Sequence, residues 1–164
     1  MSAVRKSNLV FSPADGSKLS PILVGVAGEY FVAGELSRRG LIAAITLRNS
    51  RGADILVSRP SGEKSASIQV KTSLNPTASW QLNKSDEEPK GPNHYYIFVV
   101  LNGHDGHPEY HIVKGDIVTR CKEEHQEWLK GKKRDGGERK DPDRRVFQPR
   151  PGENFRDRWE DIDV

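Results

Sequence analysis

Three polar residues, Asp54, Gln69 and Lys71, interrupt two apolar stretches of the 164-residue chain, and their types point to metal and phosphate chemistry. Gln69 and Lys71 are two residues apart, so in a strand they share one face while the flanking apolar side chains point to the other. An acid, an amide and a lysine on a half-buried strand are costly to desolvate unless something pairs with them. A divalent metal together with a phosphate would pair with all three.

A β-hairpin is predicted to position these residues. Residues 54–58 and 67–71 form short apolar runs rich in Ile and Val, and Pro60, Ser61 and Gly62 lie in the polar turn between them. Asp54 begins the first strand of this hairpin, where it can lie beside the polar side chains of the second.

The surrounding sequence predicts one helix before the hairpin and more strands after it. Apolar residues at three- and four-residue steps predict a helix over 22–39, ending at Gly40. Further strands are expected over 41–47, 95–101 and 110–113, and a second helix is expected to begin with a cap at Asp116. A short extended piece around 80–82 leads into a charged connection over 83–92 that can hold a helical turn. This order predicts an α/β sandwich, with a central mixed sheet flanked by helices.

Four segments are expected along the chain. Residues 1–21 form an irregular N-terminal arm, residues 22–129 form the core, and residues 130–150 form a basic flexible segment that is poor in apolar residues. Residues 151–164 form a C-terminal tail in which Phe155 and Trp159 pack back on the core.

Composition indicates one cytoplasmic domain. The formal charge is only +3, hydrophobic residues make up 34% and charged residues 30%, so nucleic-acid binding must rest on where the charges lie. The single cysteine, Cys121, excludes an internal disulfide and is expected to be a buried thiol. The chain shows no apolar signal core, and no run approaches the roughly 18–20 apolar residues of a membrane span.

Two simpler interpretations of the polar residues remain open at this stage. Glu29 lies on or next to the core-facing stripe of the first helix, where a carboxylate needs a partner, and a salt bridge at the edge of the core would provide one. Similarly, Asp54 and Lys71 can form a cross-strand ion pair, with Gln69 satisfying a strand edge.

A helix carrying Glu29, a strand opening with Asp54 and a strand Gln69-Val70-Lys71 together resemble the PD-(D/E)XK nuclease superfamily. The Gln-x-Lys form is similar to the Mrr-type restriction endonuclease branch, and the resemblance covers residues 24–113. It implies a restriction-endonuclease-like α/β sandwich that hydrolyses phosphodiester bonds in DNA with Mg²⁺, for which Mn²⁺ can substitute. A carboxylate-bound Mg²⁺ activates water and acts as a Lewis acid, while a lysine beside it orients the water, binds the phosphate or assists proton transfer.

The resemblance also assigns roles to individual residues. Lys71 takes the place of the catalytic lysine, and Ala53 replaces a proline that does no chemistry. Gln69 replaces a carboxylate, so the remaining acids must supply more of the charge that Mg²⁺ prefers, and a second metal is harder to hold. The implied metal ligands, which with Lys71 make up the catalytic site, are Asp54, Gln69, the backbone carbonyl of Val70, and Glu29.

The basic segment is the expected contact for nucleic acid. It contains nine Lys or Arg residues against four Asp or Glu, which suits either a solvated loop or contact with phosphates. Cutting both strands of a duplex requires two sites, so a homodimer is expected. The alternative function is a non-catalytic nucleic-acid-binding or protein-interaction module that retains the nuclease fold. The residues predicted to contact nucleic acid are Lys130, Lys132, Lys133, Arg134, Arg139, Lys140, Arg144 and Arg145.

Overall fold

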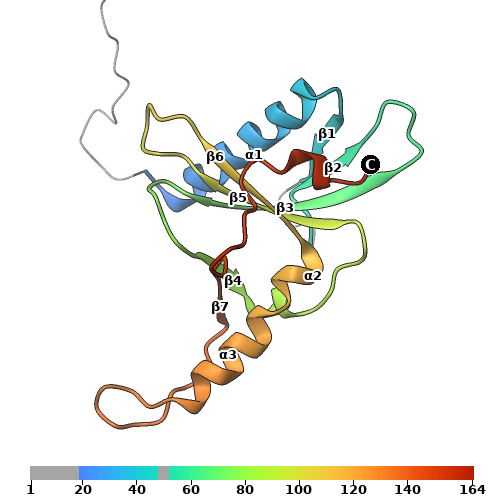
Figure 1. Ribbon diagram of the computed structural model, residues 1–164. Helices are drawn as coiled ribbons and strands as arrows, with labels where there is room; N and C mark the ends of the chain where they lie inside the picture. Colours follow the sequence, from blue (N-terminus) through green and yellow to red (C-terminus); the bar gives the residue numbers. More distant parts are fainter. Residues whose placement is uncertain (1–18, 48–51) are drawn as a thin grey trace, which may run out of the picture.

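The computed structural model describes residues 19–47 and 52–164, which are built around a five-stranded mixed sheet (Figure 1). The strand order is β1-β2-β3-β5-β6, in which β3 and β5 are parallel and all other neighbours are antiparallel. The predicted mixed α/β class is therefore confirmed. The strands of this sheet are β1 (Ile42–Ile45), β2 (Ile55–Ser58), β3 (Ser65–Ser73), β5 (His94–Val100) and β6 (Glu109–Lys114).

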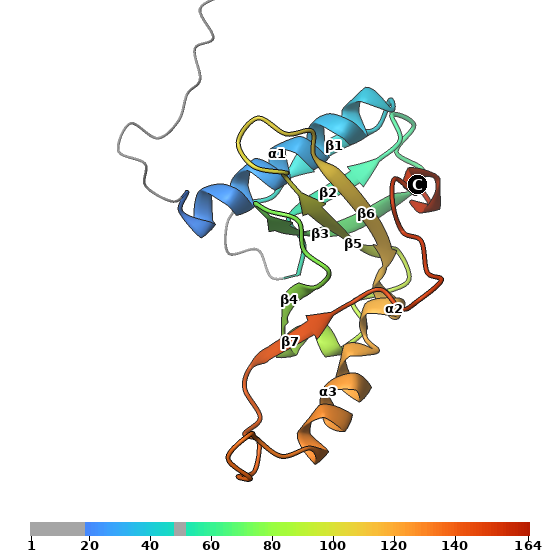
Figure 2. The ribbon, with the colours of Figure 1, turned by 60° about the vertical axis from the view of Figure 1, so that its left-hand side comes forward.

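Helix α1 (Pro21–Arg38) covers one face of the sheet, where η2 also packs, and the other elements gather on the second face or at the ends of the sheet (Figures 1 and 2). On the second face, β4 and β7 form a separate antiparallel pair. These further elements are β4 (Trp80–Asn83), η1 (Lys84–Glu87), α2 (Gly115–Val118), α3 (Cys121–Lys130), β7 (Arg144–Phe147) and η2 (Trp159–Asp161).

Helix α1 begins and ends close to its predicted bounds. The side chain of Ser20 accepts a hydrogen bond from the Ile22 N–H, and Pro21 occupies the first turn, where its missing N–H costs nothing. At the other end Gly40 adopts a φ of 82°, a conformation that glycine tolerates best. Of the predicted N-terminal arm, residues 1–18 lie outside the described residues.

Strand β5 is the common wall of two apolar cores. All seven of its residues are buried. Tyr95, Ile97 and Val99 pack with α1 and with Trp159 from the C-terminal tail. Tyr96 and Phe98 face the other way and pack with residues of β4, β7 and α3. Trp159 thus packs on the same side of the sheet as α1, whereas Phe155 packs on the other side.

The segment after residue 114 departs from prediction in two ways. The expected single helix is divided into α2 and α3, and Asp116 lies inside α2 instead of capping it. Residues 130–150 were expected to lack regular structure, but Arg144–Phe147 form β7 because Phe147 is buried against the ring of Phe98, 4.9 Å away. Helix α3 and the loop after it project away from the five-stranded sheet (Figure 2).

The outer surface of α1 is unusually apolar for an exposed helix face. Ile22, Leu23, Tyr30 and Phe31 are 46–67% exposed there. Within residues 19–47 and 52–164, no helix combines the length and the apolar character that crossing a bilayer requires.

The approach of α1 to β3 depends on Gly28. A methyl carbon placed on Gly28 would lie 2.9 Å from Cβ of Thr72, a contact that rotation of the Thr72 side chain does not relieve. We therefore expect Gly28→Ala to lower the free energy of unfolding by about 1–3 kcal/mol, as measured by urea denaturation. Gly34→Ala is the matched control, because the same helix has nothing within 4 Å of a methyl group there. It should gain up to about 1 kcal/mol. Equal effects of the two substitutions would contradict close packing at Gly28.

Candidate functional site

The predicted hairpin places Asp54 where β2 and β3 begin to separate. The β2–β3 pairing ends at Ile55 opposite Ile68, and the backbone N–H of Asp54 still donates to the Ile68 carbonyl at 2.8 Å. Two residues further along β3, the Val70 N–H donates to the Asp54 side chain, at 2.7 Å from Oδ2. The carboxylate thus replaces the partner strand as the acceptor at this fork.

Gln69 lies directly against this carboxylate. Its Nε2 donates to Asp54 Oδ2 at 3.0 Å. Both contacts use the same oxygen, so Oδ1 of Asp54 has no hydrogen-bond partner among the described residues. Gln69 and Lys71 share one face of β3, while Ile68 and Val70 are buried on the α1 side, as the alternation predicts.

Lys71 pairs with Asp86 and not with Asp54. Its Nζ is 3.6 Å from Oδ2 of Asp86, and its side chain is 18% exposed. The cross-strand ion pair between Asp54 and Lys71, which the sequence left open, is therefore not formed. Asp86 belongs to η1, in the connection between β4 and β5.

Asp86 is the most enclosed carboxylate of this region, with 2% of its surface exposed. Besides Lys71, it accepts from the Asn83 N–H at 2.9 Å, from the Tyr96 hydroxyl at 2.8 Å and from Lys90 Nζ at 2.6 Å. Burial alone would raise the pKa of Asp86, but the bond from Lys90 and the charge of Lys71 outweigh burial and hold this pKa below its ordinary value. Asp86 is therefore a buried anion shared by two amines.

A chain of polar contacts joins Asp86 back to Asp54. Lys90 Nζ lies 3.4 Å from Oε1 of Gln69, whose Nε2 binds Asp54. Burial and the neighbouring Asp86 charge raise the pKa of the Tyr96 hydroxyl far above its ordinary value, so Tyr96 remains a neutral donor. Two carboxylates and two amines thus sit within one connected network.

This network borders a cavity of about 700 Å³. The cavity lies between the start of β3, η1 and the segment leading into β5. Its polar lining includes Ser67, Gln69, Asn83, Asp86, Lys90 and His94.

His94 is buried at the back of this region, with 1% of its surface exposed. Its Nδ1 lies 2.8 Å from the Ser67 hydroxyl. Burial, and then the positive charge of Lys90, lower the pKa of His94 to about 4, against the opposing effect of Asp86. The ring is therefore neutral at physiological pH.

The implied metal ligands fit a divalent cation in part. Asp54 presents an unshared carboxylate oxygen, and Gln69 adds an amide oxygen, both hard donors of the kind Mg²⁺ prefers. Glu29 is half-buried on α1 next to Gly28, and Gly28 approaches Thr72 on the face of β3 opposite Gln69 and Lys71. Among residues 19–47 and 52–164, no three His, Cys, Asp or Glu side chains come together as a metal cluster.

The residues that sequence analysis missed are Asp86, Lys90 and His94. The connection over 83–92 was expected to hold only a helical turn, and η1 is that turn. A signal for Asp86 was present, because an acid three residues after Asn83 can turn back to the Asn83 N–H at the start of a helical turn. Nothing local in the sequence indicated that this turn would cover Lys71.

The predicted cationic residues divide into two groups. Lys132, Lys133, Arg134, Lys140 and Arg144 are exposed, and Lys130 is exposed while it pairs with Glu127. Arg139 is half-buried, with its guanidinium 4.7 Å above the ring of Trp128.

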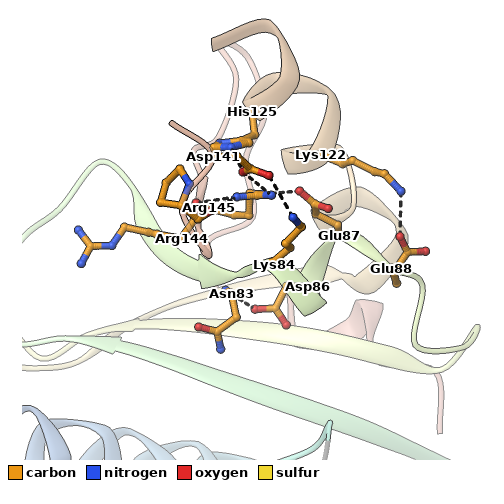
Figure 3. Close-up of polar contacts among 11 residues, drawn as sticks. Asn83, Lys84, Asp86, Glu87, Glu88, Lys122, His125, Asp141, Arg144 and Arg145 are labelled. Atoms are coloured by element: carbon orange, nitrogen blue, oxygen red, sulfur yellow. Dashed lines mark hydrogen bonds and ion pairs between the residues drawn. The ribbon is translucent and has the colours of Figure 1, made fainter. Parts of the chain in front are cut away.

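Arg145 does not belong to the phosphate-contacting surface that was predicted for it. Its side chain is only 2% exposed, and it is bound to Glu87 and Asp141 (Figure 3). Asp141 also binds Lys84 and His125 in the same cluster. By contrast, the guanidinium of Arg144 points away from this cluster (Figure 3).

We compared the sequence with models of known protein families and with curated proteins, and neither comparison gave a match. The nuclease resemblance therefore rests on the residues and on the hairpin that holds them.

The pKa of His94 predicts a specific pH dependence of stability. The unfolded chain binds a proton at His94 near pH 6.5 and the folded protein only near pH 4, so stability is lost as pH falls through this window. We expect His94 to account for roughly 2 kcal/mol of the loss between about pH 7 and pH 5. Gln does not titrate, so the free energy of unfolding of His94→Gln, measured by urea denaturation, should fall by about 2 kcal/mol less than that of the wild type over this pH range.

His104→Gln is the control, because His104 is exposed in the turn before β6. His111, whose pKa burial also lowers, contributes equally in all of these proteins. An identical pH profile for His94→Gln and the wild type would show that His94 is not held neutral by the fold.

Proposed function

We propose that this protein is a metal-dependent endonuclease of the restriction-endonuclease-like α/β class that hydrolyses phosphodiester bonds in DNA. The observation that carries the proposal is the fork of the β2–β3 hairpin. There the Asp54 carboxylate binds Gln69 Nε2 and the Val70 N–H through a single oxygen, with Lys71 on the same face of β3. An acid, a hard neutral oxygen and an amine thus belong to one hairpin, and Gln69 also lines the cavity.

Asp54, Gln69 and the carbonyl of Val70 would hold the metal. Glu29 is not included among these ligands, because α1 packs on the face of β3 opposite Gln69. When bound, Mg²⁺ would lower the pKa of a water ligand and polarise the phosphate. The protein's own contribution is positional. Lys71 lies on the same face of β3 as Gln69, where it would bind the phosphate or orient the attacking water. Asp54 accepts the Val70 N–H, which fixes the carboxylate and leaves its other oxygen available.

Asp86 forms ion pairs with both Lys71 and Lys90. One buried carboxylate is shared by two amines, so this trio carries a net positive charge next to the cavity. A positive charge in a partly enclosed site attracts a phosphodiester and stabilises the additional negative charge that develops during its hydrolysis. Lys90 is therefore assigned to phosphate binding along with Lys71.

The exposed cations of the α3–β7 loop and of the first residue of β7 would extend contact along the DNA backbone. Lys132, Lys133, Arg134, Lys140 and Arg144 are all exposed, and phosphate contacts of this kind supply affinity without base specificity. Cleavage of both strands would require two copies of the site, so we propose a homodimer on DNA.

A non-catalytic nucleic-acid-binding module is the second candidate. It is favoured by the way these polar groups satisfy one another, since Gln69 donates to Asp54 and Lys71 pairs with Asp86 without any metal. The two candidates differ in whether a divalent cation enters the fork, which the following experiments test directly.

Purified protein is expected to nick or cut DNA with Mg²⁺ or Mn²⁺ and to be inactive in EDTA. Asp54→Asn and Lys71→Ala should each reduce the rate by at least about 100-fold, because they remove a metal ligand and a phosphate-binding or water-orienting group. Lys114→Ala is the matched control, since this exposed lysine ends β6 away from the cavity. Retained cleavage in either site variant, with an unchanged circular dichroism spectrum, would refute the assignment.

Gln69→Glu tests whether residue 69 is a metal ligand. The variant places a second carboxylate against Asp54 in place of an amide donor, so the metal-free protein should lose stability. Mg²⁺ should then raise its melting temperature by more than it raises that of the wild type, because ligand binding stabilises the folded state. Gln81→Glu, at an exposed position of β4, is the control. The proposed ligand role of Gln69 is refuted if Mg²⁺ raises the melting temperatures of Gln69→Glu and Gln81→Glu by equal amounts.

A further inference from the structure

A second cavity lies outside the hairpin site, between α3 and β7. It has a volume of about 440 Å³ and includes apolar side chains of Trp128, Pro142 and Val146, with Arg144, Glu124 and Gln148 also lining it. Trp128 and Val146 are 46% and 47% exposed, whereas Trp80 and Trp159 are at most 9% exposed. Trp128 is thus the one exposed indole of the three in the chain.

The exposed indole is held in place by its neighbours. The ring of His125 stacks against it at 5.3 Å, and Arg139 donates to the Trp128 carbonyl while its guanidinium lies 4.7 Å from the ring. His125 is fixed in turn by Asp141, at 2.9 Å, and Asp141 binds the buried Arg145 (Figure 3). An aromatic surface that is both exposed and fixed binds ligands at low entropic cost.

Charge around the cavity selects the ligand class. Arg144 belongs to the lining and points away from the buried cluster (Figure 3), and the loop between α3 and β7 adds exposed Lys132, Lys133, Arg134 and Lys140. A cavity lined by Trp128, Pro142 and Val146 beside these cations suits a planar ring attached to an anionic backbone, which is a nucleotide. In a duplex, base faces are covered by their neighbours, so only an unpaired base can stack on a protein ring.

We propose that the α3–β7 cavity binds an unpaired base of a DNA strand whose phosphates lie on the adjoining cations. The proposal rests on the proposed function for its nucleic-acid partner. It narrows the substrate to DNA that combines a duplex with unpaired nucleotides. The turn η1 connects the two sites, since Asp86 binds Lys71 while the next residue, Glu87, binds Arg145 behind the α3–β7 cavity.

Intrinsic fluorescence tests the proposal, because Trp128 is the exposed indole. The full chain would be titrated in Ca²⁺, to suppress cutting, with a blunt duplex and with the same duplex carrying a short thymine overhang. We expect the overhang to tighten binding roughly 5- to 150-fold and to quench the fluorescence, given the strength of base–aromatic stacking. Trp128→Ala should abolish both effects and leave blunt-duplex affinity unchanged, whereas Trp128→Phe should keep part of the preference.

Two further variants separate the contributions. Gln126→Ala, at an exposed and uncharged position of α3, is the control and should behave like the wild type. The triple variant Lys132→Ala, Lys133→Ala, Arg134→Ala should weaken both duplexes alike and make the salt dependence of affinity shallower by about 2–3 in the log–log slope. Melting temperatures of all variants verify that each is folded.

Equal affinity for blunt and overhang duplexes would overturn the proposal, and so would an overhang preference that survives Trp128→Ala. Protection of Trp128 from acrylamide that rises with protein concentration would also overturn it, because a second copy would then cover the cavity. These binding results can be distinguished from the result of the cleavage assay that tests the hairpin site. A Trp128-dependent overhang preference without Mg²⁺-dependent cutting would sustain this inference and refute the nuclease, and cutting without that preference would do the reverse.

Discussion

The parallel pairing of β3 with β5 is the constraint on which the rest of the structure depends. The two strands pair over seven residues, from Ser67 opposite His94 to Ser73 opposite Val100. Parallel neighbours cannot be joined by a tight turn, so the chain must cross over the sheet between them. Here residues 74–93 make that crossing, and they form β4 and η1 on the face that carries Gln69 and Lys71. The sheet topology therefore brings Asp86 to the lysine.

The crossing leaves charges in places where charges are costly. Asp86 and Arg145 are each only 2% exposed, and each is surrounded by partners of opposite charge. A buried ion pair adds little net stability. The loss of one partner leaves the other as an unpaired buried charge, which costs about 3–5 kcal/mol of stability. These ion pairs restrict the position and orientation of η1, because Asp86 and Glu87 must point in opposite directions to reach Lys71 and Arg145 (Figure 3). They specify one position of the turn more than they stabilise it.

Local pattern in the sequence predicted the sheet and the hairpin well. Alternation placed Gln69 and Lys71 on one face of β3, and the apolar runs located β2, β5 and β6 to within a few residues. The position of Asp54 beside Gln69 followed from the same hairpin. These successes share a cause, because neighbouring strands joined by short turns leave few alternative pairings.

Prediction failed where contacts join distant parts of the chain. The pairing of β4 with β7 links residues more than sixty positions apart, and no local feature of Arg144–Phe147 signals that partner. Arg145 looked like part of a solvated basic run until its contact with Glu87 showed it to be buried. Lys90 and Asp86 were hidden in the same way, because a charged connection with no apolar periodicity carries no sign of the surface it will cover.

The crossing segment, residues 74–93, can also change in sequence independently of the hairpin. It enters and leaves the sheet at fixed points, the end of β3 and the start of β5, while the fork is formed by Asp54, which immediately precedes β2, and by β3. Mutations within residues 74–93 can therefore change which charges surround Lys71 without altering the strand register that presents it. Under selection, the fork and the crossing are free to diverge at different rates. A chain with this topology can retune its electrostatic surroundings by replacing one connection, and the sheet itself need not be rebuilt.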